Sequence, residues 1–449
     1  MYFKSSSSNG VAPVRHGRRN AKQLLLLVIC VAFGTTQAPA LAQNAADLKA
    51  LGIREISGKH IDLFTDLPSE AAIDELPQVF DAAVPLLEKY FALGKGALDD
   101  WRVKASVIRD SERFRRADLL PPDLPPFLHG FARKRDLWVN DQPSDYYRRH
   151  LLLHEGVHAL MAEFLHGMGP PWYAEGMAEL LATHHWKKGE LKVNYFPKTR
   201  EEVPEWGRVK VLRDAVAANA IPALDEIMAY DHRAHLVAPP YAWSWAACVF
   251  FESHPKYSKA FAELQKQTEL DEVKFNATFA KAFHADKSLL AHEWQAFVSE
   301  ADYGCDVERT YLQCVQAKPI DSKGLKLTLR VDRGWQSSGV LIESGKQYEI
   351  RVSGRYVIRT NPSKWESEPN GVTVHYHRGK PIGMILGAML DESASPPATS
   401  PLLNGVAIGG GIDFLAKSSG VLYLKVNESA AELADNQGEF VVEVREKQK

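Results

Sequence analysis

His154-Glu155-Gly156-Val157-His158 lies within residues 149–164, a stretch whose apolar side chains recur at helical spacing. Residues four positions apart share one face of a helix, so both imidazoles would point the same way. Two imidazoles at this spacing can hold one Zn²⁺, and Glu155 beside them is placed to take a proton from water. We therefore expect His154 and His158 to be zinc ligands and Glu155 to be a general base.

Zinc needs a third protein ligand. The metzincin pattern would place a glycine three residues and a histidine six residues beyond the second histidine. Met161 and Phe164 occupy those positions, which excludes that pattern. The other source is a Glu from a following helix, and residues 171–179 (PWYAEGMAE) supply Glu175 and Glu179 in an apolar setting.

These two segments together resemble the gluzincin zinc metallopeptidases, in which a helix with an E-G-x-A-E or N-E-x-x-x-D pattern follows the first. By this resemblance Glu175 is the third zinc ligand, and Glu179, one turn later, orients a ligand histidine without binding the metal. Sixteen residues separate His158 from Glu175, slightly fewer than in the best-known gluzincins, so Glu179 stays open as the direct ligand. We expect three nearby histidines to lie on the surface or in loops: His166, His184 and His185.

The gluzincin resemblance covers residues 59–303. Residues 60–67 (HIDLFTDL) look like the opening strand of small peptidase MA-like bacterial proteins. Residues 131–139 (FARKRDLWV) read as one exposed strand, which in gluzincins forms the active-site edge and pairs with an extended peptide. Tyr241 begins a helical run and resembles the tyrosine whose hydroxyl donates to the oxyanion in aminopeptidase-type gluzincins; an aromatic core residue is the alternative. The resemblance implies zinc-assisted hydrolysis of peptide bonds.

The apolar patterns divide the chain into an α+β region over residues 43–303 and an all-β region over residues 324–449. In the second region, short alternating segments separated by Gly, Pro, Asn and Ser predict a β-sandwich. The expected strands of the first region are residues 60–65, 102–108 and 131–139, with helices at 69–91, 145–166 and from 170 to about 298. The expected strands of the second region are residues 325–331, 347–358, 372–376, 420–426 and 439–444.

The four cysteines lie apart in the sequence, and three of them follow residue 43. We expect residues 304–323 to be a linker in which Cys305 and Cys314 form a disulfide in an oxidising compartment. Cys248 lies in an apolar helical run and is expected to be a buried thiol.

The sandwich segments resemble the calcium-dependent galactophilic bacterial lectins and their galactose-binding-like relatives over residues 324–446, on WQSSG at 335–339, YEIRVSG at 348–354 and LYLKVNE at 422–428. In those lectins the loop before the last strand binds Ca²⁺ and sugar together. The ligand positions fall here on Glu428, Glu432, Asp435 and Asn436. Oxygen ligands suit Ca²⁺, but Glu428 replaces an Asp and Glu432 replaces a Thr. An acidic hairpin loop without a ligand is the alternative.

The first 42 residues read as a secretory signal peptide. Basic residues precede an apolar run at residues 24–33, and Ala40-Leu41-Ala42 gives a small-x-small cleavage site. The run is about ten residues long, too short for the alternative, a membrane anchor. We expect cleavage near Ala42, a secreted or periplasmic location and no membrane contact after cleavage.

The composition is that of a globular protein, because 45% hydrophobic and 24% charged residues exclude a collagen, a coiled coil and a wholly disordered chain. A net charge of −2 leaves no basic surplus for nucleic acid. Two functions follow. The first is a secreted or periplasmic zinc peptidase whose β-sandwich targets glycans or proteins. The second is a non-catalytic carbohydrate- or protein-binding protein with a degenerate peptidase-like region.

Overall fold

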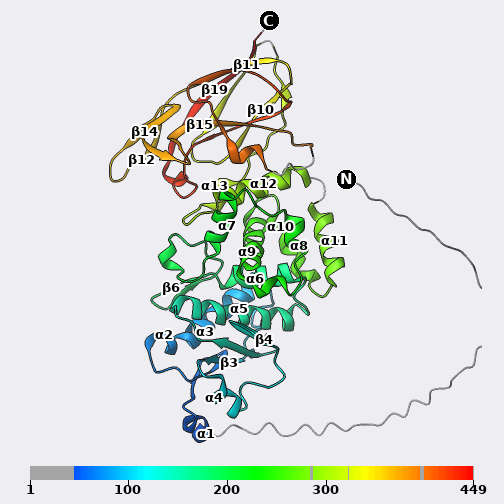
Figure 1. Ribbon diagram of the computed structural model, residues 1–449, viewed down its shortest axis with the longest axis vertical. Coiled ribbons are helices and arrows are strands. Elements are labelled where there is room, and N and C mark those ends of the chain that lie inside the picture. The colour runs from blue at the N-terminus through cyan, green and yellow to red at the C-terminus, as the bar shows by residue number, and fades with distance from the viewer. Residues whose placement is uncertain (1–44, 284–286, 322, 395–398, 448–449) are drawn as a thin grey trace, which may run out of the picture. The chain divides into compact units, whose positions relative to one another are not determined.

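The computed structural model describes residues 45–447 apart from 284–286, 322 and 395–398 (Figure 1). The signal peptide expected over residues 1–42 lies outside the described residues. None of the helices in this described part of the chain combines the length and the apolar character that crossing a bilayer requires.

A five-stranded sheet with the order β1-β2-β3-β5-β4 opens the described chain. β2, β3 and β5 run parallel to one another, while β1 and β4 lie antiparallel at the two edges. The expected strands at 60–65 and 102–108 are therefore confirmed. The strands are β1 Arg54–Ser57, β2 Ile61–Thr65, β3 Val103–Ile108, β4 Gly130–Arg133 and β5 Asp136–Asn140.

Side chains on this sheet alternate between two faces, as the pleat of a strand requires. Leu63 and Val139 join the large hydrophobic core formed with α3 and α5. Their sequence neighbours Phe64 and Trp138 instead pack with Phe114 of α4 on the opposite face. The helices of these layers are α1 Ala45–Ala50, α2 Ala71–Asp74, α3 Leu76–Tyr90, α4 Ser111–Arg116 and α5 Asp145–Phe164.

Residues 131–139 form an antiparallel hairpin, so the expectation of a single exposed strand is wrong. Lys134 adopts a φ of 58°, which turns the chain between β4 and β5. β5 then pairs with β3 inside the sheet and is largely buried, and β4 is left at the edge. The basic residues that interrupt this stretch mark a turn between two strands.

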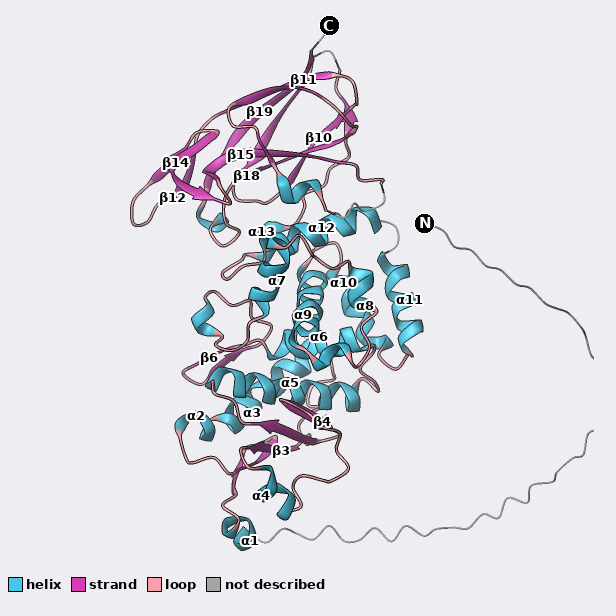
Figure 2. Cartoon of the chain, in the orientation of Figure 1, coloured by secondary structure: helices cyan, strands magenta, loops and turns pink. Residues whose placement is uncertain are grey.

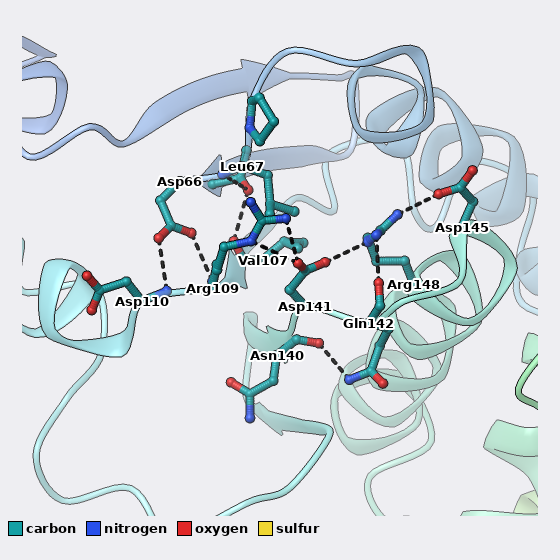
Figure 3. Close-up of polar contacts among 12 residues, drawn as sticks. Asp66, Leu67, Val107, Arg109, Asp110, Asn140, Asp141, Gln142, Asp145 and Arg148 are labelled. Atoms are coloured by element: carbon teal, nitrogen blue, oxygen red, sulfur yellow. Dashed lines mark hydrogen bonds and ion pairs between the residues drawn. The ribbon is translucent and has the colours of Figure 1, made fainter.

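α5 begins at the carboxyl ends of the parallel strands, where a group of ion pairs holds it (Figure 3). The hydroxyl of Ser144 caps the helix by accepting a hydrogen bond from Tyr147 N at 3.1 Å. Asp141, directly after β5, pairs with Arg109 after β3 at 3.0 Å and with Arg148 in the first turn of α5 at 2.8 Å. These contacts fix the start of the helix that carries His154.

α5 packs against α6, and α6 packs along α9. Both α6 and α9 begin with proline in the first turn, where its missing N–H leaves no hydrogen bond unmade. The remaining helices are α6 Pro171–Ala182, α7 Arg208–Ala217, α8 Leu224–Met228, α9 Ala238–Ser253, α10 Ser258–Glu263, α11 Glu272–Phe283, α12 Lys287–Glu300 and α13 Val307–Thr310. A small hairpin after α6 is formed by β6 His185–Lys187 and β7 Glu190–Lys192.

The all-β region expected after residue 324 is confirmed, since two sheets there enclose one hydrophobic core (Figure 2). One sheet has the order β14-β15-β18-β10-β8 with β16 beside β15, and the other has β13-β12-β19-β11-β17 with β9 beside β19. Residues 347–358, expected as one strand, form two strands that separate near Gly354, whose φ is 119°. The strands are β8 Lys318–Pro319, β9 Leu325–Arg330, β10 Gln336–Ile342, β11 Gln347–Ser353, β12 Tyr356–Arg359, β13 Trp365–Ser367, β14 Asn370–His377, β15 Lys380–Leu390, β16 Val406–Ala407, β17 Gly411–Leu415, β18 Gly420–Val426 and β19 Gln437–Lys447.

The disulfide expected between Cys305 and Cys314 is not formed, and the cysteines among the described residues are all free. Cys305 is buried just after α12, whereas the Cys314 sulfur accepts a hydrogen bond from the Tyr423 hydroxyl of β18 at 3.4 Å. Cys248 is fully buried in α9, as expected. Residues 304–323 contain α13 and β8, so they are more structured than a plain linker.

A group of charges, with Glu300 and Lys425 buried and Arg378 exposed, joins α12 to the all-β region. Glu300, at the end of α12, accepts a hydrogen bond from Lys425 of β18 at 2.6 Å and pairs with Arg378 at 3.1 Å. Burial alone would raise the pKa of Glu300, but the two cations outweigh it and lower the pKa to about 2. Glu300 is therefore an ionised carboxylate whose charge is compensated by residues more than seventy positions later in the chain.

Candidate metal centre

Three side chains from α5 and α6 meet around one point. His154 Nε2 lies 3.1 Å from His158 Nε2 and 3.1 Å from Glu175 Oε2. His158 Nε2 lies 3.4 Å from the same carboxylate oxygen. Two imidazole nitrogens and one carboxylate oxygen in such a triangle could hold a metal ion. The structure thus brings together three residues that the sequence singled out.

Glycines allow the helices that carry these ligands to approach closely. A Cβ at Gly176 would lie 2.6 Å from the backbone oxygen of Ser244 on α9, so α6 can pack at this distance only without a side chain there. That contact fixes Glu175, the residue before it. A Cβ at Gly156 would lie 2.6 Å from Phe80 on α3, which fixes α5 in the same way.

Glu155 lies beside the triangle and against the edge strand β4. It is 5% exposed, and a Cβ at Gly130, the first residue of β4, would overlap its Oε1 atom. The carboxylate therefore packs directly on the backbone of the edge strand. Burial raises the pKa of Glu155 to about 8, against the opposing charge of His158.

Glu179 occupies a different position from Glu175. Its Oε1 atom lies 3.6 Å from Nδ1 of His154, the ring nitrogen that points away from the triangle, and its Oε2 atom lies 3.4 Å from His150 Nε2. Arg208 binds the same two oxygens at 2.7 and 3.0 Å. Burial works against ionisation, but Arg208 and His150 outweigh it and hold the pKa of Glu179 well below its usual range. This geometry suits a residue that orients His154.

Glu175 is held in its ionised form by different neighbours. Burial would raise its pKa, yet the charges and hydrogen bonds of His158 and His154 hold the pKa well below the usual range. Of the two glutamates on α6, Glu175 is the one whose oxygen faces both Nε2 atoms.

A second group of potential ligands, His150, His154 and Glu179, also lies close together. The guanidinium of Arg208 contacts both oxygens of Glu179, and its positive charge opposes a cation there. Sequence reasoning missed both His150 and Arg208. His150 lies one helical turn before His154, so its spacing carried a usable signal, whereas Arg208 follows Glu179 by 29 residues with no pattern between them.

Tyr241 lies in the first turn of α9, and its ring centroid is 6.1 Å from that of His154. The Arg208 guanidinium carbon lies 5.6 Å from the Tyr241 ring centroid. Burial, with a further contribution from Glu175, raises the pKa of Tyr241 well above its usual value. The Tyr241 hydroxyl is thus protonated at neutral pH, and its ring lies beside that of His154.

The three neighbouring histidines lie outside the triangle. His184 lies in the loop between α6 and β6, as one of the two expected placements, but it is buried there and stacks on Tyr146 with ring centroids 4.6 Å apart. Burial lowers the pKa of His184 to about 3. His166 is exposed and His185 is half-buried in β6.

The acidic loop of the all-β region does not form a comparable group. Glu428 is buried and accepts hydrogen bonds from Asn436 Nδ2 at 2.8 Å and from the Tyr356 hydroxyl at 3.3 Å. The only sets of three His, Cys, Asp or Glu ligands within reach of one ion, among the described residues, are the two on α5 and α6, so Glu428, Glu432 and Asp435 are not gathered. Burial raises the pKa of Glu428 to about 8.

No family model and no curated protein matches this chain. Among solved structures, the chain is similar to one titled "EclA N-terminal domain; PllA-like lectin", with 18% sequence identity. That match covers 27% of this chain and 95% of the other, with a TM-score of 0.20. A TM-score this low does not establish a shared fold.

Proposed function

We propose that the chain is a secreted or periplasmic zinc-dependent peptidase that hydrolyses peptide bonds. The observation that carries the proposal is the meeting of His154 Nε2, His158 Nε2 and Glu175 Oε2 beside the buried Glu155. Zinc bonded at about 2.0–2.2 Å in a tetrahedron separates its ligand atoms by about 3.4 Å. The three distances of 3.1, 3.1 and 3.4 Å are close to that separation, so the residues fit zinc.

Zinc, when bound, supplies Lewis acidity toward a water molecule and a carbonyl oxygen. Glu155, in its ionised form, accepts the proton of the attacking water and later gives it to the leaving amine. The Tyr241 hydroxyl donates a hydrogen bond to the oxyanion of the tetrahedral intermediate. Glu179 keeps His154 turned with its Nε2 atom toward Glu175. β4, at the edge of its sheet, offers backbone hydrogen bonds to an extended peptide.

Elemental analysis of the purified mature chain, beside His154→Ala, tests the metal. We expect about one zinc per wild-type chain, as one three-ligand site implies, and its loss in the variant. Screening a peptide library with wild type and Glu155→Gln then tests hydrolysis. A wild-type chain that takes up no zinc, even after reconstitution, contradicts the proposal and favours the alternative of a non-catalytic carbohydrate- or protein-binding protein.

A second candidate function, calcium-dependent glycan binding by the loop at residues 428–436, rests on a separate observation. Glu428 Oε1 and Asn436 Oδ1 are buried and have no hydrogen-bond partner within the part of the chain that the structure describes. Buried oxygen atoms normally have a hydrogen-bond partner. Oxygen atoms also coordinate Ca²⁺, so a bound calcium ion would satisfy these two. A glycan array probed with the whole mature chain, with Ca²⁺ and with a chelator, tests this function. A signal that needs Ca²⁺ and is lost in Glu428→Gln supports it, and the absence of any glycan signal removes it.

A further inference from the structure

The guanidinium group of Arg208 is buried, and its hydrogen bonds go to other groups of the protein. Arg208 is the first residue of α7 and is 6% exposed. Its Nε and Nη2 atoms bind the two oxygens of Glu179 at 3.0 and 2.7 Å, and its Nη1 atom donates to the backbone oxygen of Trp206 at 3.0 Å. A bidentate fork of this kind holds the plane of a carboxylate as well as its position.

Each oxygen of Glu179 is shared between Arg208 and one imidazole. Oε1 faces Nδ1 of His154 at 3.6 Å, and Oε2 faces Nε2 of His150 at 3.4 Å. Because the fork prevents rotation of the carboxylate, Oε1 stays on the side of His154 that is opposite the triangle. At 3.6 Å this contact is electrostatic and not a hydrogen bond, and it favours the orientation of the His154 ring in which Nε2 faces Glu175.

The same guanidinium reaches the other side of the site. Its central carbon lies 5.6 Å from the Tyr241 ring centroid, within the range of a cation–π contact. It also interacts electrostatically with Tyr147, which lies on α5 two turns before His154. Arg208 therefore touches the partner of His154, the ring of Tyr241 and the helix that carries both histidines.

We propose that Arg208 is a positioning residue that sets the orientation of His154, through Glu179, together with that of Tyr241. The proposal rests on the zinc peptidase function proposed above. A lysine cannot substitute, because a single ammonium cannot bind both Glu179 oxygens in the plane of the carboxylate and face the Tyr241 ring at once. Arg208 would thus position a metal ligand and the hydroxyl that donates to the oxyanion at the same time.

The central variant is Arg208→Lys in the full mature chain, which keeps the buried positive charge but removes the fork. The matched control is Arg213→Lys on the same helix, whose side chain is 61% exposed and pairs with Asp302 at 3.5 Å. We expect Arg208→Lys to weaken Co²⁺ and Zn²⁺ binding about ten-fold or more, measured against a chelator, and to change the visible spectrum of bound Co²⁺. We expect a fall in kcat with little change in KM, and no change for Arg213→Lys.

Two double-mutant cycles test separately whether Arg208 acts through Glu179 and whether it acts through Tyr241. If Arg208 acts on the metal through Glu179, then Arg208→Lys weakens metal binding far less in a Glu179→Gln background than in the wild type. If it also acts through Tyr241, its effect on kcat shrinks in a Tyr241→Phe background. Simple additivity in both cycles overturns the proposal, as does an Arg208→Lys variant with wild-type metal affinity and kcat.

Folding is checked by thermal melting of the metal-free variants. If Arg208→Lys does not fold, the double variant Arg208→Gln/Glu179→Gln removes both buried charges together and leaves neither unpaired. The proposal then expects the metal affinity of the double variant to equal that of Glu179→Gln alone. A further drop overturns it.

The readouts also separate this proposal from the proposed function. In the metal-free chain, the ¹⁵N resonances of the His154 ring report its orientation without any activity, and Arg208→Lys should shift them more than those of His158. A wild-type chain that cleaves no peptide, but whose His154 resonances and metal affinity respond to Arg208→Lys, contradicts the peptidase and leaves the positioning role standing. Cleavage by the wild type with no response to the variant contradicts only the positioning role.

Discussion

The triangle between α5 and α6 holds the half-buried carboxylate of Glu175, and the acidic loop at residues 428–436 holds the buried carboxylate of Glu428. The neighbours of these two groups shift their pKa values in opposite directions. Glu175 faces two imidazoles, which hold its pKa well below the usual range despite burial. Glu428 faces an amide and a hydroxyl, and burial raises its pKa to about 8. The first carboxylate is built to be an anion in the folded state, whereas the second carries its charge only at a cost.

The difference follows from the elements that carry the two groups. His154 and His158 lie one helical turn apart on α5, and Glu175 lies on a helix locked to α9 at Gly176, so their donor atoms converge without help from a ligand. The acidic residues of the loop are spread between the end of β18 and the start of β19, where no repeat fixes their spacing. Packed helices hold the ligand atoms together before any ion binds. In a loop, the bound ion must itself bring the ligand atoms together.

The largest expected effect is on peptide hydrolysis, which a substitution beside the triangle should reduce and a substitution in the acidic loop should not. Glu155→Gln removes the group that moves the proton, so peptide hydrolysis should fall by at least about 10²-fold while zinc content stays the same. The matched variant Glu428→Gln, at a buried carboxylate of the acidic loop, should leave hydrolysis unchanged. Initial rates on a cleaved library peptide and elemental analysis check both. Equal losses in the two variants would contradict the assignment of the chemistry to α5.

The next effect is a pH dependence of stability that arises in the loop. In the folded chain the pKa of Glu428 is raised to about 8, while in the unfolded chain the carboxyl group loses its proton near its ordinary pKa of 4.5. The folded state therefore binds more protons between these values, and the free energy of unfolding falls as pH rises from about 4.5 to about 8. At about 1.4 kcal/mol per pKa unit, we expect this group to contribute a loss of at least about 1 kcal/mol.

Urea unfolding at pH 5 and pH 8 measures this change, and comparison with Glu428→Gln isolates the contribution of the one carboxyl group. Ca²⁺ at pH 8 should restore stability to the wild type alone if the loop binds it, because the ion favours the carboxylate form. An identical pH slope in wild type and Glu428→Gln would show that the carboxyl group is not held protonated.

A smaller effect tests how rigidly the helices gather the ligands. Gly176→Ala places a methyl group 2.6 Å from Ser244 O, so α6 must move away from α9, and we expect a loss of about 1–3 kcal/mol in the free energy of unfolding. Gly94→Ala is the control, since a Cβ there meets nothing within 4 Å. Metal affinity measured on both variants shows whether the displacement reaches Glu175. A Gly176→Ala chain as stable as Gly94→Ala would mean that the helix contact is looser than the structure shows.

The smallest effect concerns the junction between the two regions. Because the described cysteines are free, adding reductant should shift the melting temperature by less than about 1 °C, whereas loss of a disulfide typically removes about 2–5 kcal/mol. Alkylation of the unfolded, unreduced chain should modify Cys248, Cys305 and Cys314. A Cys305–Cys314 cross-link in the peptide map would restore the expectation drawn from the sequence.

Local patterns predicted much of the candidate site. Helical spacing placed His154 and His158 on one face, and the E-G-x-A-E resemblance chose Glu175, whose oxygen faces both Nε2 atoms. His150 lies four residues before His154, so the same helical spacing also places it on this face. Arg208 could not be found in this way, because only the packing of α7 brings it to Glu179.

The strands were less predictable where both faces of a strand are covered. In β15 apolar residues do not alternate with polar ones, because both faces of the strand are covered. Ile385 joins the core between the two sheets, and its neighbour Leu386 joins a second hydrophobic cluster with Ala296 of α12. The hairpin at β4 and β5 was hidden by a turn at Lys134 that uses neither glycine nor proline. The spacing of Cys305 and Cys314 suggested a disulfide. In the fold, however, the Cys314 sulfur lies beside the Tyr423 hydroxyl, from which it accepts a hydrogen bond.

The Glu300 contacts determine how the chain can be dissected. A fragment that stops at residue 303 keeps Glu300 but loses Lys425 and Arg378, and a fragment that starts at residue 324 keeps those cations but loses their anion. Lys425 is 6% exposed, so either cut leaves a charge that was paired and buried without its counterion. Truncated pieces would report the damage done by the cut, and separate roles for the two regions are better assigned with point variants of the undivided chain.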